Sequence, residues 1–484
     1  MEKPKAARTV VATVFIALVL DLLAFTLPLP LFPRLIAWYL QKEVDQPSAI
    51  LPRLLSLTNS WRSFLFSKSG TALGRQLSAS TEDTKNWDVV LLGGVMGSLF
   101  SFCQCVISPK LGSLSDRYGR KKVLLATMLG NILSAVIWLK STGFSTFLLS
   151  RLVGGLSEGN VQLSTAIISD VTTAATRSKS LALVGIAFSI CFTLGPSLGA
   201  YFASRPLPIA KSGTDHWNVY ATPAAISLGL LLLESLYLIV KLPETRHWRS
   251  QGSENKEVQD KEGVVVKDSS KSRLDRLRKT GRYHCAFLLF FSGAEFTLTF
   301  LTYDLFGATN AQNGRLLSYI GVLAAMLQAR YVRPALARKG ELQVAYTGLV
   351  VATCSFFLLA TMPLGCVRDS DVVSTIVLYA AATGLAYVSA TVVTGLTAAA
   401  AACCDEEGEG SDETLRRGRA LGGFRSMGQL GRAIGPLLAS SVYWLLGPLL
   451  CYLAIASCLS MVGLQLRGYL AREAKRRDKA SKTQ

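Results

Sequence analysis

Apolar runs close to twenty residues long follow one another along this sequence, separated mostly by short polar segments. A helix needs about 20 predominantly apolar residues to cross the hydrocarbon core of a bilayer. Charged residues make up only 17% of the chain, against about 25% in soluble domains, so a soluble core is excluded. We therefore expect an all-α polytopic membrane protein with 12 spans. They are predicted at residues 10–33, 89–109, 123–140, 146–170, 180–202, 219–242, 284–303, 314–333, 343–362, 372–400, 420–444 and 448–466.

The positive charge of the chain predicts its sidedness. The formal net charge is +19, a value that in a soluble protein suggests nucleic-acid binding. Here the excess lies in short loops after even-numbered spans, such as Arg117 to Lys122, and in the terminal tails. Positive loops stay on the cytoplasmic side of a membrane, so we expect both termini there and no nucleic-acid partner. The sequence leaves open whether this is the plasma membrane or that of an organelle.

A charged segment without apolar periodicity divides the chain into two sets of six spans. The expected units are an N-terminal bundle at 1–242 with an outer loop at 34–88, a flexible cytoplasmic linker at 243–283, a C-terminal bundle at 284–466 and a basic cytoplasmic tail at 467–484. In the outer loop, apolar residues around Leu51 predict a short amphipathic helix on the membrane surface. Pro196 and Pro436 follow glycines at matched depth, which indicates two pseudo-symmetric halves.

One hydrophilic turn, between the second and third spans, reads G-S-L-S-D-R-Y-G-R-K-K. We assign a gating role to its residues Gly112, Asp116, Arg117, Gly119 and Arg120. An acid among cations, with glycines beside them, suits a tight hairpin that docks on another part of the protein. We expect Asp116 to contact the positive N-terminus of the eleventh span, near Leu421 and Gly422, when the inner side is closed. The alternative is an ordinary basic cytoplasmic turn.

Charged residues inside spans are costly and usually face a cavity or a partner. The candidates for substrate or proton binding are Asp21, Arg151, Glu158, Glu295 and Arg432. Asp21 and Glu295 lie in the first span of each half, so we expect them to face a central cavity from opposite sides. A buried carboxyl group takes up a proton more readily than an exposed one. For both acids a polar contact between helices is the alternative.

The arginines extend this prediction to the charge of the substrate. Arg425 and Arg432 lie two turns apart on one flank of the eleventh span, where they would attract an anion. Arg425 lies six residues after Arg419, so a place near the cytoplasmic surface is the alternative for it. Arg151 lies two turns before Glu158, and its alternative is snorkelling to the membrane surface. In the empty carrier we expect an acid to pair with one of these arginines.

Three of these patterns resemble the major facilitator superfamily. The turn has the form G-x-L-x-D-R-x-G-R-K, which resembles the loop between helices 2 and 3 of that superfamily. Arg151 opens a run R-x-x-G-G similar to a fourth-span pattern of proton-coupled members. In the fifth span the residues similar to the antiporter motif are Gly185, Gly195, Pro196 and Gly199. The resemblance implies a helix that moves against the eighth span during exchange.

Longer stretches narrow the resemblance within the superfamily. L-D-L-L-A-F-T-L-P-L-P-L-F-P and F-T-L-G-P-S-L-G-A are similar to the bacterial tetracycline/proton antiporters, and more so to an animal tetracycline-transporter-like branch. That resemblance implies a monomeric secondary transporter of small organic solutes, with organic anions associated with the animal branch and a proton or counter-anion as coupling partner. A proton-coupled multidrug or tetracycline-type efflux carrier and a non-transporting receptor or scaffold are the alternatives.

Other classes of protein lack their signatures in this sequence. The chain contains no P-loop, so transport driven by nucleotide hydrolysis is not expected. Its ten cysteines and three histidines form no metal-ligand spacing, and no nucleophile and base converge. We expect no cofactor, no metal and no enzyme activity.

Overall fold

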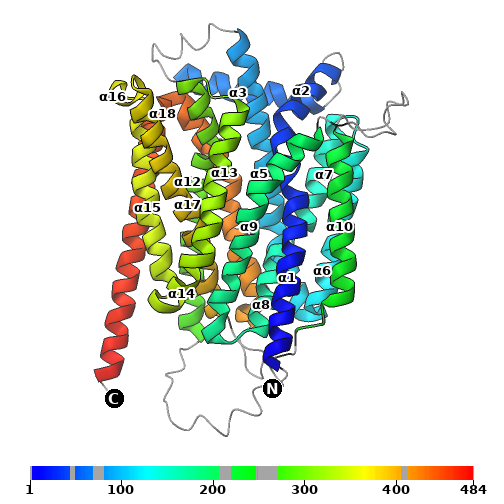
Figure 1. The fold of residues 1–484 in the computed structure, drawn as a ribbon, viewed down its shortest axis with the longest axis vertical. Helices are drawn as coiled ribbons and strands as arrows, with labels where there is room; N and C mark the ends of the chain where they lie inside the picture. Colours follow the sequence, from blue (N-terminus) through cyan, green and yellow to red (C-terminus); the bar gives the residue numbers. More distant parts are fainter. Residues whose placement is uncertain are drawn as a thin grey trace.

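A computed structural model describes residues 3–43, 50–68, 81–203, 220–246, 270–404 and 413–482, together with positions 205 and 248. Long helices run side by side through the molecule, and shorter ones lie across one end (Figure 1). The N-terminus of α1 and the C-terminal end of α18 lie at the opposite end. We call this the terminal end of the molecule, and the other one the outer end.

The first half of the chain supplies six crossings of the bundle. They are formed by α1 (Lys3–Thr26), α5 (Thr81–Tyr118), α6 (Arg120–Leu139), the pair α7 (Phe144–Ser157) and α8 (Asn160–Val171), α9 (Ala174–Ala203) and α10 (Ala221–Lys241). The fourth crossing is broken because Glu158 and Gly159 leave the helical conformation, with ψ of 98° at Glu158. The sequence predicted one continuous span there.

The second half repeats this plan with different interruptions. Its crossings are α12 (Ser270–Phe306), the series α13 (Asn310–Leu327), η3 (Gln328–Val332) and α14 (Arg333–Lys339), then α15 (Glu341–Thr361), α17 (Asp371–Ala402) and the two parts of α18 (Arg417–Lys482). Two short helices, α16 (Gly365–Arg368) and η4 (Glu413–Leu415), lie between crossings. Gly447, with φ of 81° and ψ of 168°, separates the two parts of α18, and only glycine adopts such a conformation without strain.

Eight of the described helices are long and apolar enough to cross a membrane. They are α1, α6, α9, α10, α12, α15, α17 and α18. The remaining crossings are made by α5, by the interrupted series in the fourth and eighth positions, and by the second part of α18. The described chain therefore has the all-α architecture that the apolar runs predict. Its apolar residues outside the buried core, such as Leu129 and Leu464, face outward, as lipid-facing side chains do.

The outer loop contains helices that pack against the protein. They are η1 (Leu29–Leu31), α2 (Phe32–Glu43) and α3 (Ile50–Lys68), and residues 44–49 and 69–80 lie outside the described part. Leu51 is fully buried in a cluster with Tyr39 and Trp138. Glu43 Oε1 accepts a hydrogen bond of 2.6 Å from the backbone N–H of Phe144 at the start of α7. The helix expected on the membrane surface is thus docked on the outer end of the first half.

Two further segments differ from the units expected from sequence. Residues 270–283, which we assigned to the flexible linker, form the first turns of α12, and α18 continues through most of the basic tail. The linker at 249–269 lies outside the described residues. At the beginning of the linker, Glu244 accepts hydrogen bonds from the backbone N–H groups of Arg120 and Lys121, at 2.8 and 3.2 Å. The start of the linker therefore belongs to the packed terminal end.

Candidate functional site

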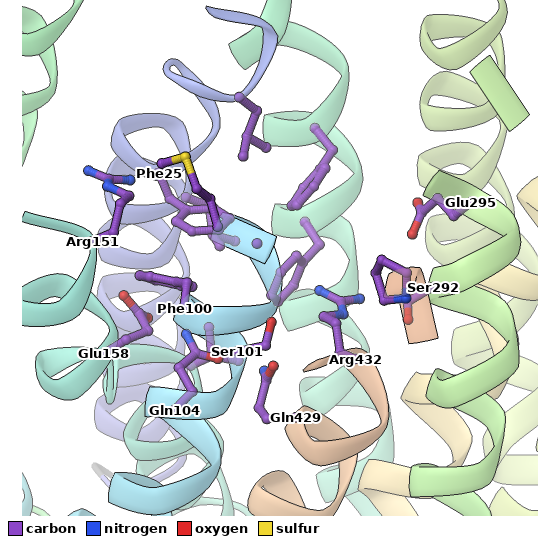
Figure 2. Close-up of a pocket in the computed structure, with 18 of the residues that line it drawn as sticks. Phe25, Phe100, Ser101, Gln104, Arg151, Glu158, Ser292, Glu295, Gln429 and Arg432 are labelled. Atoms are coloured by element: carbon purple, nitrogen blue, oxygen red, sulfur yellow. The ribbon is translucent and has the colours of Figure 1, made fainter. Parts of the chain in front are cut away.

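A cavity of about 280 Å³ lies between the two halves of the bundle. All five charged candidates from the sequence line it, and they are Asp21, Arg151, Glu158, Glu295 and Arg432. Figure 2 shows Arg151 and Glu158 on one wall, Glu295 and Ser292 on the opposite wall, and Arg432 between them. The volume is that of a small organic molecule, near the lower end of typical ligand sites.

The basic side of the cavity is formed by α18. Arg425 and Arg432 are both half-buried, and Gln429 lies between them on the same stripe of the helix. Among the described contacts, neither arginine makes a hydrogen bond or an ion pair, and Arg432 Nε is buried without a partner. The internal ion pair that the sequence suggested is therefore not formed at Arg425 or Arg432 among the described contacts. The cavity instead holds two guanidinium groups whose hydrogen-bond donors are available to an anion.

The position of Arg425 agrees with the cavity-facing stripe expected from the sequence and not with the surface alternative. The helix begins at Arg417, so Arg425 lies about 12 Å along its axis, inside the bundle and not at the membrane surface. Its guanidinium acts electrostatically on Asp21 and Glu158 across the cavity. Although Arg425 lies only six residues after Arg419, it lines the same cavity as Arg432.

Two acids form the opposite side, on the first half of the chain. Asp21 is buried, and its Oδ1 accepts a hydrogen bond of 2.6 Å from Asn160 Nδ2 at the start of α8. Glu158, at the break between α7 and α8, has Asn131 Nδ2 at 3.4 Å from its Oε2, a weak contact. The break in the fourth crossing therefore places both an acid and an amide next to Asp21.

The other two candidates, Arg151 and Glu295, lie in different surroundings. Arg151 lies over two aromatic rings, 5.8 Å from the Trp138 centroid and 5.5 Å from the Phe147 centroid, in addition to lining the cavity. Cation–π contacts of this kind hold an arginine in place inside a protein. Glu295 is exposed to the cavity from α12, and Arg432 is the cation that acts on it. Neither Glu295 nor Arg432 makes an ion pair in the described contacts.

Aromatic side chains close the apolar part of the cavity. Phe25 contacts Phe100 and Phe192 at centroid distances of 5.3 and 6.4 Å, and Phe188 stacks on Phe192 at 5.9 Å. Phe296 lines the wall on the other half. Rings at these distances form the edge and offset contacts that aromatic groups prefer. The cavity thus combines two cations with a surface suited to an apolar or aromatic body.

The glycines of the fifth crossing have two different partners. A Cβ added at Gly195 would overlap Thr26 Oγ1, and one at Gly199 would overlap the carbonyl oxygen of Leu27, so both glycines allow α9 to lie against α1. Only Gly185 faces the eighth crossing, where a Cβ would overlap Gln328. Pro196 lies inside α9, which is unbroken. The resemblance implied movement against the eighth span, which Gly185 faces, but Gly195 and Gly199 pack on the first.

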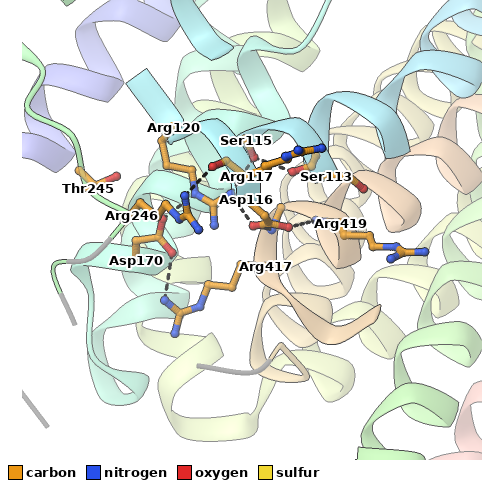
Figure 3. A network of polar contacts seen from close by, with 12 residues as sticks. Ser113, Ser115, Asp116, Arg117, Arg120, Asp170, Thr245, Arg246, Arg417 and Arg419 are labelled. Carbon is orange, nitrogen blue, oxygen red and sulfur yellow. Dashed lines mark hydrogen bonds and ion pairs between the residues drawn. The ribbon is translucent and has the colours of Figure 1, made fainter. Parts of the chain in front are cut away.

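The sequence turn from Gly112 to Lys122 closes the terminal end of the cavity (Figure 3). Asp116 is buried and accepts three hydrogen bonds: from Arg120 Nη1 at 2.7 Å, from Gly418 N at 2.9 Å and from Arg419 N at 2.7 Å. The expected contact with the N-terminus of the eleventh span is therefore present, one turn earlier than Leu421 and Gly422. At this point the two halves touch, so the terminal end is closed in this conformation.

Asp170, which the sequence analysis missed, completes this contact. It lies at the end of α8, and accepts a hydrogen bond from Arg120 Nε at 2.9 Å and another from Arg417 Nη1 at 3.0 Å. One buried acid thus joins an arginine from each half. Arg117 is exposed and outside this set, with its carbonyl oxygen accepting from Arg246 Nη1 at 2.6 Å.

The hairpin itself is shorter than the sequence suggested. Residues 112–118 belong to α5, and the turn is made by Gly119 alone, whose φ of 103° favours glycine. A Cβ at Gly112 would overlap the carbonyl oxygen of Gly418, so this glycine allows α5 and α18 to approach closely.

A profile of the Major Facilitator Superfamily matches residues 14–407, which is most of the chain. The chain belongs to the major facilitator superfamily. Members of this superfamily are secondary transporters and not enzymes, so the chain is a multi-pass integral membrane transporter. The charged cavity between the halves, together with the contact around Asp116, is accordingly the candidate transport site and its closed terminal gate.

Relatives narrow the place of the chain within the superfamily. Human major facilitator superfamily domain-containing protein 10 is 34% identical over 453 residues, which cover 92% of this chain and 90% of the relative. The crystal structure of the human organic anion transporter MFSD10 (TETRAN) matches with a TM-score of 0.73 over 95% of this chain and 99% of that one, at 31% identity. Tetracycline resistance protein class G of Vibrio anguillarum is more distant, at 27% over 270 residues and 55% of this chain.

A second solved structure supports the fold alone. The proton:xylose symporter XylE covers 96% of this chain at a TM-score of 0.60 but is only 15% identical. No group of three metal-ligating side chains occurs among the described residues of this superfamily member.

Proposed function

We propose that this transporter carries small organic anions across its membrane by alternating access. The observation that carries the proposal is the pair Arg425 and Arg432, two guanidinium groups in the cavity without an ion-pair partner in the described contacts. A guanidinium binds a carboxylate or sulfonate through parallel hydrogen bonds, and it does so most strongly where water is excluded. The related human protein described as an organic anion transporter supports the same class of substrate.

The aromatic wall adds a second property of the substrate. Phe25, Phe100 and Phe192 present ring surfaces to the same space that the arginines reach. We infer that the anionic group binds between the arginines and that an aromatic or otherwise apolar body rests against the rings. A hydrophilic anion of the same charge gains nothing from this wall.

The experiment is uptake into proteoliposomes that contain the purified full-length protein. Radiolabelled 2-naphthoate is the probe, and 2-naphthylmethylamine, with the same rings and the opposite charge, is the matched control. We expect uptake of the carboxylate and not of the amine, with acetate as a poor competitor. Selective uptake of the amine would contradict the proposal and favour a cation carrier.

Variants of Arg432 assign the anion to the cavity. Loss of a hydrogen-bonded charge pair costs about 2–3 kcal/mol, so Arg432→Ala should weaken 2-naphthoate uptake about 30- to 140-fold. Arg432→Lys keeps the charge without the fork of donors and should be intermediate. Arg467→Ala, an exposed arginine on the same long helix, is the control and should transport normally. Normal uptake in Arg432→Ala would remove span 11 from the substrate site.

We further propose that transport is antiport and that the terminal end is cytoplasmic. The basic loops at that end support this orientation by the positive-inside rule. Acids in the cavity, among them Asp21 and Glu295, are the candidates for a coupled proton. Uptake of 2-naphthoate with and without an imposed pH gradient tests proton coupling, and stimulation by 2-naphthoate preloaded on the opposite side tests exchange.

A further inference from the structure

A further buried acid, Glu234, lies on α10 and does not line the cavity. Glu234 is 1% exposed, and its Oε2 has no hydrogen-bond partner. It does not line the cavity, so the proposed anion site leaves it without a role. Asp21, which does line the cavity, is 2% exposed, and its Oδ2 is also buried without a hydrogen-bond partner. The two acids thus share one property, a buried carboxyl oxygen without a hydrogen-bond partner in the described structure.

The packing of α1 on α10 places these acids one turn apart in depth. The two helices are neighbours, and Ser227 Oγ of α10 donates a hydrogen bond of 3.1 Å to the carbonyl oxygen of Ala24 in α1. Toward the terminal end, Asp21 is three residues from Ala24 on one helix and Glu234 is seven from Ser227 on the other. At 1.5 Å per residue, Glu234 therefore lies about 6 Å closer to the terminal end of the molecule than Asp21.

The charges around Glu234 are of its own sign. The groups that act on it are Asp21 and Glu158, both acids. The cation of this region, Arg425, acts on Asp21 and Glu158 from the cavity side. Glu234 is therefore a buried carboxyl group within electrostatic range of two other carboxyl groups, and Arg425 is not among the charges that act on it.

The remaining elements packed against α10 do not change this balance. From α6, Lys121 donates to the carbonyl oxygen of Ile239 at 2.8 Å, more than a turn beyond Glu234 toward the terminal end. From α9, the Cys191 thiol contacts Asp21 electrostatically and donates to Val19 O at 3.3 Å. An ionised carboxylate without a cation or donor is strongly unfavourable inside a protein, whereas the protonated acid is neutral.

We propose that Glu234 is a buried proton-binding site that exchanges its proton with Asp21. In the conformation described here Glu234 carries the proton as a carboxylic acid. When α1 and α10 shift during transport, the O–H of Glu234 donates to the free Oδ2 of Asp21, and the proton passes to it. Asp21 is then the acid and Glu234 the carboxylate, and the reverse step restores the first state. The role of this proton exchange in transport rests on the proposed function. Proton binding by Glu234 itself does not.

Infrared spectroscopy of the full-length protein in lipid bilayers tests proton binding directly. A protonated carboxyl group has a C=O stretching band that is separate from the carboxylate bands and shifts in heavy water. At neutral pH we expect such a band in the parent protein, its loss in Glu234→Gln and its return in Glu234→Asp. Asp304→Asn, which removes an exposed acid near the outer end of α12, should leave the band unchanged. An unchanged band in Glu234→Gln would overturn the proposal.

Thermal unfolding provides a second measurement on the same samples. Glutamine has the shape of the neutral acid, so the unfolding midpoint of Glu234→Gln should stay within about 2 °C of the parent value. A large decrease would show that Glu234 is ionised and held by a cation, contrary to the proposal. The two measurements require no transported substrate, so they stand even where 2-naphthoate uptake fails.

The exchange with Asp21 is tested by the pH dependence of 2-naphthoate uptake. Glu234→Gln should flatten this dependence while uptake continues, and Glu234→Asp should restore it. A purely structural role for Glu234 would lower uptake equally at every pH. Loss of the infrared band together with an unchanged pH profile would confine Glu234 to storage of a proton and refute its exchange with Asp21.

Discussion

Replacing Asp116 with asparagine should open the terminal end of the transporter. The parent carboxylate accepts three hydrogen bonds, two of them from the backbone N–H groups of Gly418 and Arg419 in the first turn of α18. Asparagine has one acceptor oxygen, and its amide would point hydrogens at one of these donors. At least one charge-assisted hydrogen bond is therefore lost, and we expect the loss to fall on the two bonds from α18, which join the halves only while the terminal end is closed.

The size of the effect follows from that count. A hydrogen bond to a charged group contributes about 1.5–3 kcal/mol, so the equilibrium between closed and open terminal ends should shift about 10- to 140-fold. The first N–H groups of a helix have no partner within the helix, so Asp116 is what protects those of Gly418 and Arg419. Hydrogen exchange of the peptide that covers 413–422, measured by mass spectrometry, should accelerate by a similar factor in Asp116→Asn.

A nearby acid provides the matched control. Glu413 is exposed and lies 3.6 Å from Arg419 Nη1, and exposed ion pairs contribute about 0–1 kcal/mol. Glu413→Gln should therefore leave both exchange and 2-naphthoate uptake close to the parent values. Equal exchange rates in Asp116→Asn and the parent would refute the gate, and so would unchanged uptake at equal expression.

Other substitutions test separate parts of the structure. Gly199→Ala should destabilise the protein by about 1–3 kcal/mol because the added methyl group would push α9 off α1. Gly229→Ala, with open space around it, should instead stabilise α10 by about 0.5–1 kcal/mol. Thermal unfolding compares the two variants, and equal unfolding midpoints would contradict the packing of α9 on α1. Asp21→Asn should remove the pH dependence of 2-naphthoate uptake, and its loss in Glu295→Gln alone would transfer proton binding to span 7. Glu244→Ala should lower stability by about 1 kcal/mol, because two backbone N–H groups at the start of α6 lose their acceptor, and hydrogen exchange there should report it.

Sequence alone predicts those parts of the site where an ionised side chain lies inside a span. An ionised side chain inside a span is so costly that it must find a cavity or a partner, and this is why Asp21, Glu295 and Arg432 could be placed on one cavity in advance. Their roles in transport stay predictions. The contact of Asp116 with α18 was predictable for a similar reason, because an acid among cations in a short turn needs a docking partner, and a helix N-terminus supplies it. Its gating role stays a prediction.

The rest depends on tertiary packing that a linear sequence does not express. For Arg425 a surface position stayed open as the alternative, because the direction in which α18 enters the bundle is unknown from sequence. Glu234 was a visible signal, an acid within the sixth predicted span, but its relation to Asp21 comes from the register of two antiparallel helices. The break at Glu158, which brings Asn160 to Asp21, has only Gly159 as a local signal.

Two native thiols lie under the closed terminal end. Cys403 and Cys404 follow α17, and both are buried, with Cys404 close to Arg417 and Asp116. Burial raises the pKa of the Cys404 thiol to about 12, and only a thiolate reacts readily with maleimides. The buried Cys404 thiol is therefore unreactive toward maleimides while the end is closed. We expect both thiols to become accessible when the two halves separate, so their labelling, distinguished by peptide mapping from that of the exposed Cys354 and Cys366, would report an open terminal end.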